Sequence, residues 1–277
     1  MKLSLSEIST VGASFEEDVA AYAAAGFDGI GIWEMKLRDH AAGLTLVREA
    51  GLGVANCIPT VPSLLQLGLP GMEGPPSPEE RLESICDSVR ALAAFEPQCV
   101  VLITGPIGER DEHEARQLVL DGMRQVASVA REAGVLVGLE PIHPRQRESV
   151  SFVNSVEDAL ALLSDAALED VGIMADTYNL WHEEPRTLAR IAERVTGLHV
   201  ADESAEPGRT DRVLPGEGGT RSAEQVRALV DAGWEGYLDV EIFSTPDRFW
   251  ALPVDEAARR AYAAARALLA PQGQTVP

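Results

Sequence analysis

The sequence predicts an α/β fold, a single (β/α)8 TIM barrel over residues 1–277. Short apolar runs rich in Val, Ile and Leu alternate eight times with longer amphipathic or alanine-rich stretches, as consecutive βαβ units do. The length of 277 residues is close to the roughly 250 residues typical of one such barrel. The expected strands lie near residues 2–6, 28–33, 53–58, 99–104, 135–140, 171–176, 196–201 and 236–242.

The stretches between these strands carry residues typical of helix ends. Ser14 followed by Glu17 predicts a capping box, and Gly26 predicts the end of the same helix. Pro78 suits the first turn of a later helix. Elsewhere a helix ends in Ala-Gly and the next strand starts almost at once, a tight connection found in barrels and in doubly wound sheets. The tail after Leu269 should fray.

Two connections are too long to be simple turns. Residues 59–77 are rich in proline, glycine and leucine, and residues 202–221 are polar with several turn residues. Each follows an expected strand, so both should lie on the face formed by the carboxyl ends of the strands. We expect residues 59–77 to form an ordered loop over the mouth of a pocket.

The charge of the chain excludes some classes of partner. Acidic residues number 44 and Lys and Arg 23, a net charge of −21, which argues against nucleic acid or an anionic membrane surface. Neither a signal peptide nor a membrane span is visible. The thiols of Cys57, Cys86 and Cys99 lack CxxC spacing and should be buried and reduced. We therefore expect a cytoplasmic protein; formation of a homo-oligomer stays open.

Four of the expected strands end in an acidic or imidazole side chain. These residues are Glu140, Asp176, His199 and Glu241. One such acid could simply cap the next helix, but the carboxyl ends of barrel strands meet on one face, so four together should converge. Clustered carboxylates repel one another unless a cation or a proton neutralises them. We therefore predict one divalent ion, Mn²⁺ first and Co²⁺, Mg²⁺ or Zn²⁺ as alternatives, since carboxylates with one imidazole suit such ions.

The strings LEPIHP, ADTYNLW, GLHVAD, LPGEG and DVEIFS resemble the xylose isomerase-like TIM barrel superfamily, and within it the sugar phosphate isomerase/epimerase family. The resemblance covers nearly the whole chain. It implies that the ion is bound by four matching residues, Glu140, Asp176, His199 and Glu241. It also implies that Glu140 and Glu241 act as an acid/base pair on opposite faces of the substrate.

The chemistry of such a site is consistent with that implication. An ion that chelates a carbonyl and the adjacent hydroxyl makes the neighbouring C–H more acidic and stabilises the enediolate left behind. Return of the proton gives an epimer or an isomer, whereas loss of a β-hydroxyl gives a dehydrated product. The sequence therefore predicts a metal-dependent isomerase or epimerase acting on a small polyhydroxylated carbonyl compound, with a lyase or dehydratase on a keto-inositol, dehydroshikimate-like or keto-glycoside substrate as the alternative.

Five further residues are candidates for binding a carbohydrate-like substrate. They are Trp33, Glu34, His143, His182 and Arg212. Trp33 could stack on a sugar ring or belong to the core, and His143 and Arg212 could be ordinary loop residues. Epimerases of the family often carry a histidine three residues after the metal-binding aspartate. Because Asn179 stands there, we expect His182 to fill its place.

Two acids, Asp202 and Glu217, are candidates to accept the second N–H of a metal-bound imidazole. Gln146 stands where ketohexose epimerases of the family carry a further acid, so a free ketohexose is not assured. A DNA-repair nuclease of the related endonuclease IV branch is disfavoured, because it needs more histidines than the five here and a basic surface. A non-catalytic sugar-binding barrel is the remaining alternative; two retained acid/base glutamates argue against it.

Overall fold

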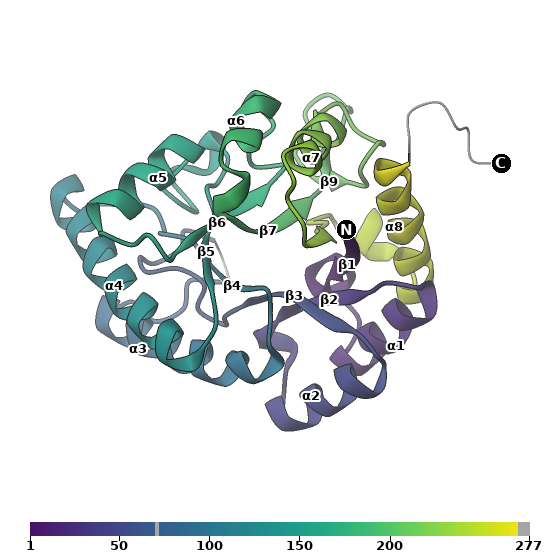
Figure 1. The fold of residues 1–277 in the computed structure, drawn as a ribbon, viewed down its shortest axis with the longest axis horizontal. Coiled ribbons are helices and arrows are strands. Elements are labelled where there is room, and N and C mark those ends of the chain that lie inside the picture. The colour runs from purple at the N-terminus through teal and green to yellow at the C-terminus, as the bar shows by residue number, and fades with distance from the viewer. Residues whose placement is uncertain (70–71, 271–277) are drawn as a thin grey trace.

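The computed structural model describes residues 1–69 and 72–270 and contains a closed barrel of eight parallel strands surrounded by helices (Figure 1). Around the barrel the strands follow the order β1-β10-β7-β6-β5-β4-β3-β2. They are β1 (Lys2–Ser6), β2 (Gly29–Trp33), β3 (Gly53–Ile58), β4 (Cys99–Leu102), β5 (Val137–Leu139), β6 (Gly172–Asp176), β7 (Val195–Val200) and β10 (Tyr237–Val240). The predicted (β/α)8 TIM barrel is confirmed. The tail after residue 270 lies outside the described residues.

Eight α-helices surround the barrel in the part of the chain that the structure describes. They are α1 (Phe15–Ala25), α2 (His40–Glu49), α3 (Pro78–Leu92), α4 (Glu112–Ala133), α5 (Val156–Asp165), α6 (Pro185–Arg190), α7 (Ser222–Asp231) and α8 (Val254–Leu269). The capping box of Ser14 and Glu17 is present at α1, which ends at Gly26 with a φ of 96°. Pro78 opens α3, as predicted.

The strands are apolar because they are buried on both faces. Every residue of β2, β4, β5 and β6 is buried, and the largest apolar cluster fills the space between barrel and helices. The thiols of Cys57, Cys86 and Cys99 are free and buried. No helix within residues 1–69 and 72–270 is both long and apolar enough to cross a membrane.

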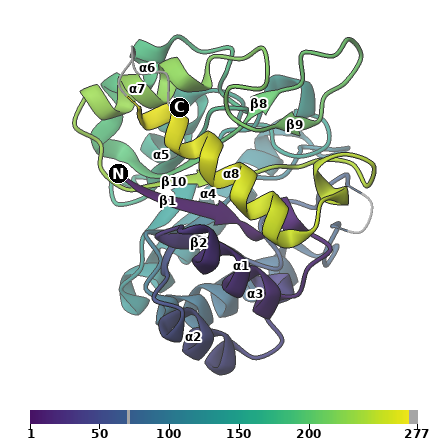
Figure 2. The same ribbon diagram turned by 90° about the vertical axis from the view of Figure 1, so that its right-hand side faces the viewer.

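The connection 202–221 contains a small antiparallel hairpin of β8 (Asp202–Glu203) and β9 (Arg212–Val213). Figure 2 shows it on the side toward which β1 points. Asp202 fixes the connection, because its carboxylate accepts hydrogen bonds from Gly216 N at 2.8 Å and Thr220 Oγ1 at 2.8 Å. The loop is therefore held over the carboxyl ends of the strands, where a substrate would enter.

A buried guanidinium fixes the other long connection. Arg81 of α3 is fully buried; its Nε donates to Ser63 O at 2.9 Å and its Nη1 to Pro75 O at 2.9 Å. Leu64 and Leu65 of the same connection are buried as well. Burial lowers the pKa of Arg81 to about 10. The cation thus pairs with backbone carbonyls of the loop.

Replacing Arg81 by an uncharged residue should destabilise the protein, because the 59–77 connection loses its hydrogen bonds to α3. Arg81→Met removes several hydrogen bonds from a charged donor and leaves buried carbonyls unpaired, so we expect a loss of about 2–3 kcal/mol in the free energy of unfolding. Urea unfolding of purified protein measures it. Arg90→Met, on the same helix, removes only an exposed pair with Asp87 and should cost under about 0.5 kcal/mol. Equal unfolding curves for the two variants would contradict this role of Arg81.

Candidate metal centre

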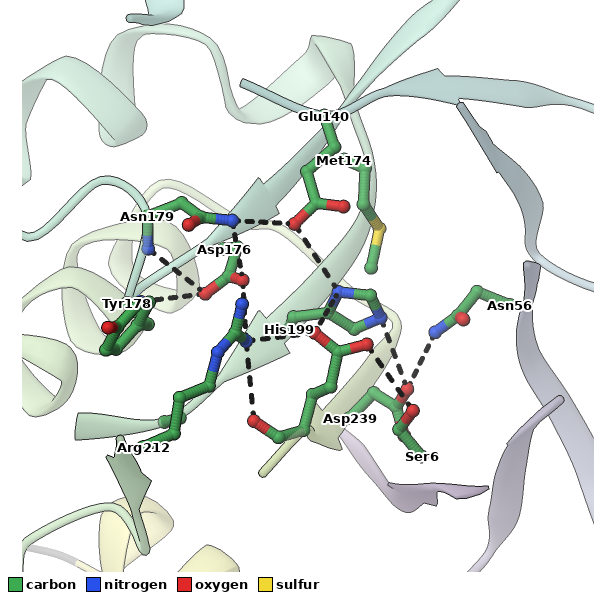
Figure 3. A network of polar contacts seen from close by, with 12 residues as sticks. Ser6, Asn56, Glu140, Met174, Asp176, Tyr178, Asn179, His199, Arg212 and Asp239 are labelled. Atoms are coloured by element: carbon green, nitrogen blue, oxygen red, sulfur yellow. Dashed lines mark hydrogen bonds and ion pairs between the residues drawn. The ribbon is translucent and has the colours of Figure 1, made fainter. Parts of the chain in front are cut away.

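Four polar side chains meet at the carboxyl ends of neighbouring and near-neighbouring strands. Glu140 directly follows β5, Asp176 ends β6, His199 lies in β7 and Glu241 directly follows β10. One ligand atom from each lies within 4.8 Å of the others, and all four residues are buried. Figure 3 shows Glu140, Asp176 and His199 pointing toward one another. The structure thus brings together the whole ligand set expected from the sequence.

The imidazole of His199 sits between carboxylates without a hydrogen bond of acceptable geometry. Its Nδ1 lies 3.8 Å from Glu140 Oε1 and 3.3 Å from Glu241 Oε2, and neither ring nitrogen has a hydrogen-bond partner. Burial alone lowers the pKa of His199, but the charges of Glu241 and Glu140 outweigh it and raise this pKa to about 10. A buried nitrogen without a partner, aimed at two carboxylates, fits a metal ligand.

Burial and mutual repulsion make the ionised forms of the clustered carboxylates unfavourable. Burial raises the pKa of Glu140 to about 7, against the opposing effect of His199 and with help from the charges of Asp176 and Glu241. Three carboxylates packed so closely in a dry site need positive charge; Arg212 supplies one unit, and a divalent ion would supply two more. Three oxygen donors and one nitrogen donor suit a divalent ion of the Mn²⁺, Co²⁺ or Zn²⁺ type. The residues present therefore fit the predicted ion.

An amide fixes the orientation of two of these carboxylates. Asn179 Nδ2 donates to Glu140 Oε1 at 2.9 Å and to Asp176 Oδ2 at 3.0 Å. The backbone N–H of Tyr178 donates to the other oxygen of Asp176 at 2.7 Å. The expectation that His182 fills this place was wrong, because Asn179 occupies it and His182 is exposed. The side chain of Asn179 is shorter than a histidine, and its amide reaches both carboxylates without adding charge.

Arg212 of β9 brings a cation into the same cluster. Its Nη1 lies 2.8 Å from Asp176 Oδ2 and 2.9 Å from Glu241 Oε2, and its guanidinium stacks 4.6 Å from the ring centroid of Tyr178 and 4.9 Å from that of Phe243. Burial opposes its charge, but these carboxylates outweigh burial and raise the pKa of Arg212. At 7% exposure it is not a solvated loop arginine.

Asp239, which is not among the residues predicted from the sequence, lies behind the imidazole. Its Oδ2 is 3.5 Å from His199 Nε2 and accepts a hydrogen bond from Asn56 Nδ2 at 2.7 Å. Gly31 of β2 makes room for it, since a Cβ there would lie 2.3 Å from Asp239 Oδ2. The signal was available: Asp239 precedes Glu241 by two residues, and alternate residues of a strand point to the same side.

Asp202 and Glu217, the acids expected to accept the second N–H of the His199 imidazole, contact other residues instead. Asp202 caps the 202–221 connection, and Glu217 is exposed and lies 3.5 Å from Arg260 Nη2. Both follow strands in the sequence, but their loop turns them away from His199. This expectation was wrong, and the carboxylate that faces the second imidazole nitrogen, 3.5 Å away, is that of Asp239.

Replacing Asp239 by Asn should weaken metal binding while keeping the shape of the barrel interior. A carboxylate beside a metal-bound imidazole orients the ring and raises its basicity, so we expect the Mn²⁺ affinity of Asp239→Asn to fall about 10- to 100-fold. Isothermal titration with Mn²⁺ measures it. Asp165→Asn, which alters an exposed pair with Arg116, should bind Mn²⁺ as wild type does; unchanged affinity in Asp239→Asn would contradict the assigned role.

Trp33 and Glu34, the two substrate-binding candidates at the end of β2, point to different places. Trp33 lines the cavity above the metal centre. The carboxylate of Glu34 instead accepts hydrogen bonds from Thr60 N at 2.8 Å and Ser88 Oγ at 2.6 Å, and lies 3.1 Å from His40 Nε2. Glu34 therefore ties the strand end to its neighbours and lines a different surface hollow. As placed, it does not reach the cavity where a substrate would bind.

The two histidines expected to contact substrate lie next to each other. The ring of His143 stacks on Trp181 at 5.7 Å and meets that of His182 edge-on at 5.2 Å. Its Nδ1 accepts from Arg145 N at 3.1 Å, while its buried Nε2 has no partner. Burial lowers the pKa of His143 to about 4. Neither histidine is among the residues that line the cavity over the ligand set.

A cavity of about 550 Å³ opens above the ligand set. Its lining includes Glu140, Glu241, Asn179 and Arg212 as well as apolar residues of the 59–77 connection. This volume lies within the range of small-molecule sites. The two predicted acid/base glutamates therefore face one substrate-sized space.

The family of the chain follows from its whole length. The profile of the xylose isomerase-like TIM barrel matches residues 19–269. The chain belongs to this family. A crystal structure of a protein from Sinorhizobium meliloti 1021 superposes with a TM-score of 0.84 at 25% identity, covering 96% of this chain and 98% of that one. The family and the barrel expected from the sequence are thus confirmed.

Two curated relatives are enzymes. The chain is 26% identical to D-psicose 3-epimerase of Enterocloster bolteae over 48% of this chain and 42% of that protein. It is 28% identical to 3-dehydroshikimate dehydratase of Pseudomonas aeruginosa over 91% of this chain and 39% of that protein. The chain thus spans less than half the length of the curated relatives it matches.

Proposed function

We propose that the protein is a divalent-metal-dependent isomerase or epimerase that acts on a sugar or sugar-like carbonyl compound by proton transfer through an enediolate. The observation that carries this proposal is the convergence of Glu140, Asp176, His199 and Glu241, buried and within 4.8 Å of one another, beneath a substrate-sized cavity. Mn²⁺ is the ion we propose first. The likeness to D-psicose 3-epimerase supports the reaction class.

Each residue has a defined task in this proposal. When bound, the ion would polarise the substrate carbonyl and stabilise the negative charge that develops on its oxygen. Glu241 removes the proton from the carbon beside the carbonyl, and Glu140 returns a proton from the other side. The two carboxylates come from β10 and β5 and both line the cavity. Asn179 and Asp239 hold the ligands in place through the contacts described above.

Dehydration is the second candidate. The alignment with 3-dehydroshikimate dehydratase runs over 91% of this chain, further than that with the epimerase. The same carboxylates can serve it, because an enediolate with a β-hydroxyl expels water once a nearby acid protonates the leaving oxygen. The two reactions share the first proton abstraction and differ in the step that follows.

One assay tests both candidates. Protein with Mn²⁺ is incubated in D₂O with a panel of keto-sugars, keto-inositols, keto-glycosides and 3-dehydroshikimate, and the products are examined by NMR and mass spectrometry. An isomerase or epimerase incorporates deuterium at the carbon beside the carbonyl, and a dehydratase gives a product lighter by one water. A metal-loaded protein that neither exchanges nor dehydrates any of these compounds would favour a non-catalytic sugar-binding barrel.

Arg212 should serve substrate binding more than chemistry. Its guanidinium lines the cavity, so Arg212→Ala removes a charge-assisted hydrogen bond to a substrate oxygen, an effect of about 10- to 100-fold on KM. We expect kcat to fall less than KM rises. Arg209→Ala is the matched control, because Arg209 bonds Asp211 and Thr245 in the same connection. A fall in kcat with unchanged KM would contradict this role.

A further inference from the structure

We infer that the substrate carries an apolar arm, aromatic or alkyl, that runs from the metal centre along the cavity wall to the rim. The inference rests on the proposed function and narrows its substrate class: the reacting end is a hydroxy-carbonyl group, and the part held by the protein is not a polyol chain. The chemistry of the cavity lining carries it.

Four polar residues of the cavity lining, Glu140, Asn179, Arg212 and Glu241, are joined by contacts with one another or with Asp176. Above them the walls are built by two apolar clusters separate from the main core. The first includes Ile8, Trp33 and Ile58 with Phe243 and Trp250 packed against it. The second contains Leu67, Ile103, Ile142 and Val150, and Met72 packs against both. All of these residues line the cavity.

The aromatic residues of the wall offer no free donor to a hydroxyl. The indole N–H of Trp33 donates to Ser6 Oγ at 3.1 Å. That of Trp250 donates to Ile8 O at 2.8 Å and Ile242 O at 3.1 Å. Neither indole N–H is therefore free to hydrogen-bond a substrate hydroxyl. What each indole can offer a ligand is its apolar surface, which suits an alkyl or aromatic group.

The apolar surface continues to the solvent. Val11 and Met35 are 45% and 60% exposed, and both line the same cavity. Together with the cavity lining they extend one apolar surface to the solvent, and a continuous exposed apolar surface of this kind is typical of a ligand-binding groove. Val11 directly follows the short helix η1 (Glu7–Thr10), which comes after β1. Met35 lies within the short helix η2 (Glu34–Lys36), which comes after β2. The arm therefore reaches the rim on the β1–β2 side.

A polyol would be poorly served by this wall. Besides Glu140 and Glu241, the polar side chains of the described lining are Asn179 and Arg212, which contact those acids or Asp176, and Gln146, Tyr178 and Thr210. The hydroxyl of Tyr178 already donates to Thr210 O at 2.5 Å. Each substrate hydroxyl moved from water to such a surface without a partner costs free energy. Few polar groups suffice for a small reacting end, which fits the proposed reaction.

Three hydroxamates that share one metal-binding group and differ in their arm test this inference. The probes are acetohydroxamate, 4-phenylbutanohydroxamate and 2,3,4-trihydroxybutanohydroxamate, titrated calorimetrically into the protein with Mn²⁺ in excess. We expect the phenyl probe to bind at least about tenfold more tightly than the other two, since it buries a ring on the apolar wall. Equal or tighter binding of the trihydroxy probe would overturn the inference while leaving the proposed function intact.

Single variants of the rim locate the arm. Val11→Ser and Met35→Ser should each weaken the phenyl probe about three- to tenfold and leave acetohydroxamate unchanged. Val230→Ser is the matched control, since Val230 is 38% exposed on α7 and does not line the cavity. Wild-type affinity of the phenyl probe in both rim variants would overturn the proposed path. Failure of acetohydroxamate to bind in a Mn²⁺-dependent manner would instead contradict the proposed function itself, and the inference with it.

Discussion

Glu241→Gln should lose about 10²- to 10⁴-fold in turnover even when Mn²⁺ is supplied in excess, because an amide cannot accept the proton that a general base removes. The side chain keeps its size, and its oxygen still faces His199 Nδ1, 3.3 Å away in the wild type. The assay is deuterium exchange at the carbon beside the carbonyl, measured at saturating Mn²⁺ with any substrate that the panel identifies.

A matched substitution separates this effect from a change in charge. Glu217→Gln makes the same replacement in the 202–221 connection, on an exposed side chain that pairs with Arg260 of α8. This variant should exchange deuterium at the wild-type rate. Wild-type turnover in Glu241→Gln would reduce Glu241 to a metal ligand and move the base elsewhere in the cavity.

Asp176→Asn and His199→Ala should each lower the affinity for Mn²⁺ by about 10- to 100-fold or more, as expected when the set of ligands is disturbed. Both residues are fully buried, so water cannot easily replace the missing donor in the same geometry. The metal content of purified protein, expected to be about one divalent ion per chain in the wild type, measures the effect together with Mn²⁺ titration.

The controls for this prediction address folding. Asp165→Asn changes an exposed carboxylate that pairs with Arg116 on the outside of the barrel, and it should retain the ion. Circular dichroism of Asp176→Asn checks that the barrel is intact. Full metal content in either ligand variant would remove that residue from the centre.

The eight strands could be predicted because burial on both faces leaves a plain signal. A run such as Gly172–Asp176 is apolar until its last residue, and the recurrence of an acid or imidazole at four such strand ends favours a shared polar site over separate helix caps. The same reasoning brought Glu140 and Glu241 into one cluster with His199. Periodicity and strand direction are therefore enough to predict that these four side chains converge.

The supporting residues were harder to predict because their roles depend on side-chain reach. The sequence predicts that His182 takes the place of the histidine that Asn179 replaces, yet the amide of Asn179 itself reaches Glu140 and Asp176. Asp202 was expected behind His199 but turns into its own loop. The course of a loop is set by its own hydrogen bonds, which the sequence pattern does not reveal.

The position of Glu34 shows the same limit. It follows a strand as the metal ligands do, but the backbone N–H of Thr60 and the hydroxyl of Ser88 draw its carboxylate toward β3 and α3. Alternation along β2 places Trp33 on the same side as Gly31, which faces Asp239, and Glu34 on the opposite side. The partners that hold Glu34 there come from segments distant in sequence, which the pattern of β2 does not reveal.

Anomalous diffraction from a crystal soaked in Mn²⁺ tests the central claim most directly. The proposal predicts one strong peak at about 2.0–2.3 Å from donor atoms of Glu140, Asp176, His199 and Glu241. A peak elsewhere, or none at these side chains at saturating Mn²⁺, would contradict the proposed metal centre and the chemistry that depends on it.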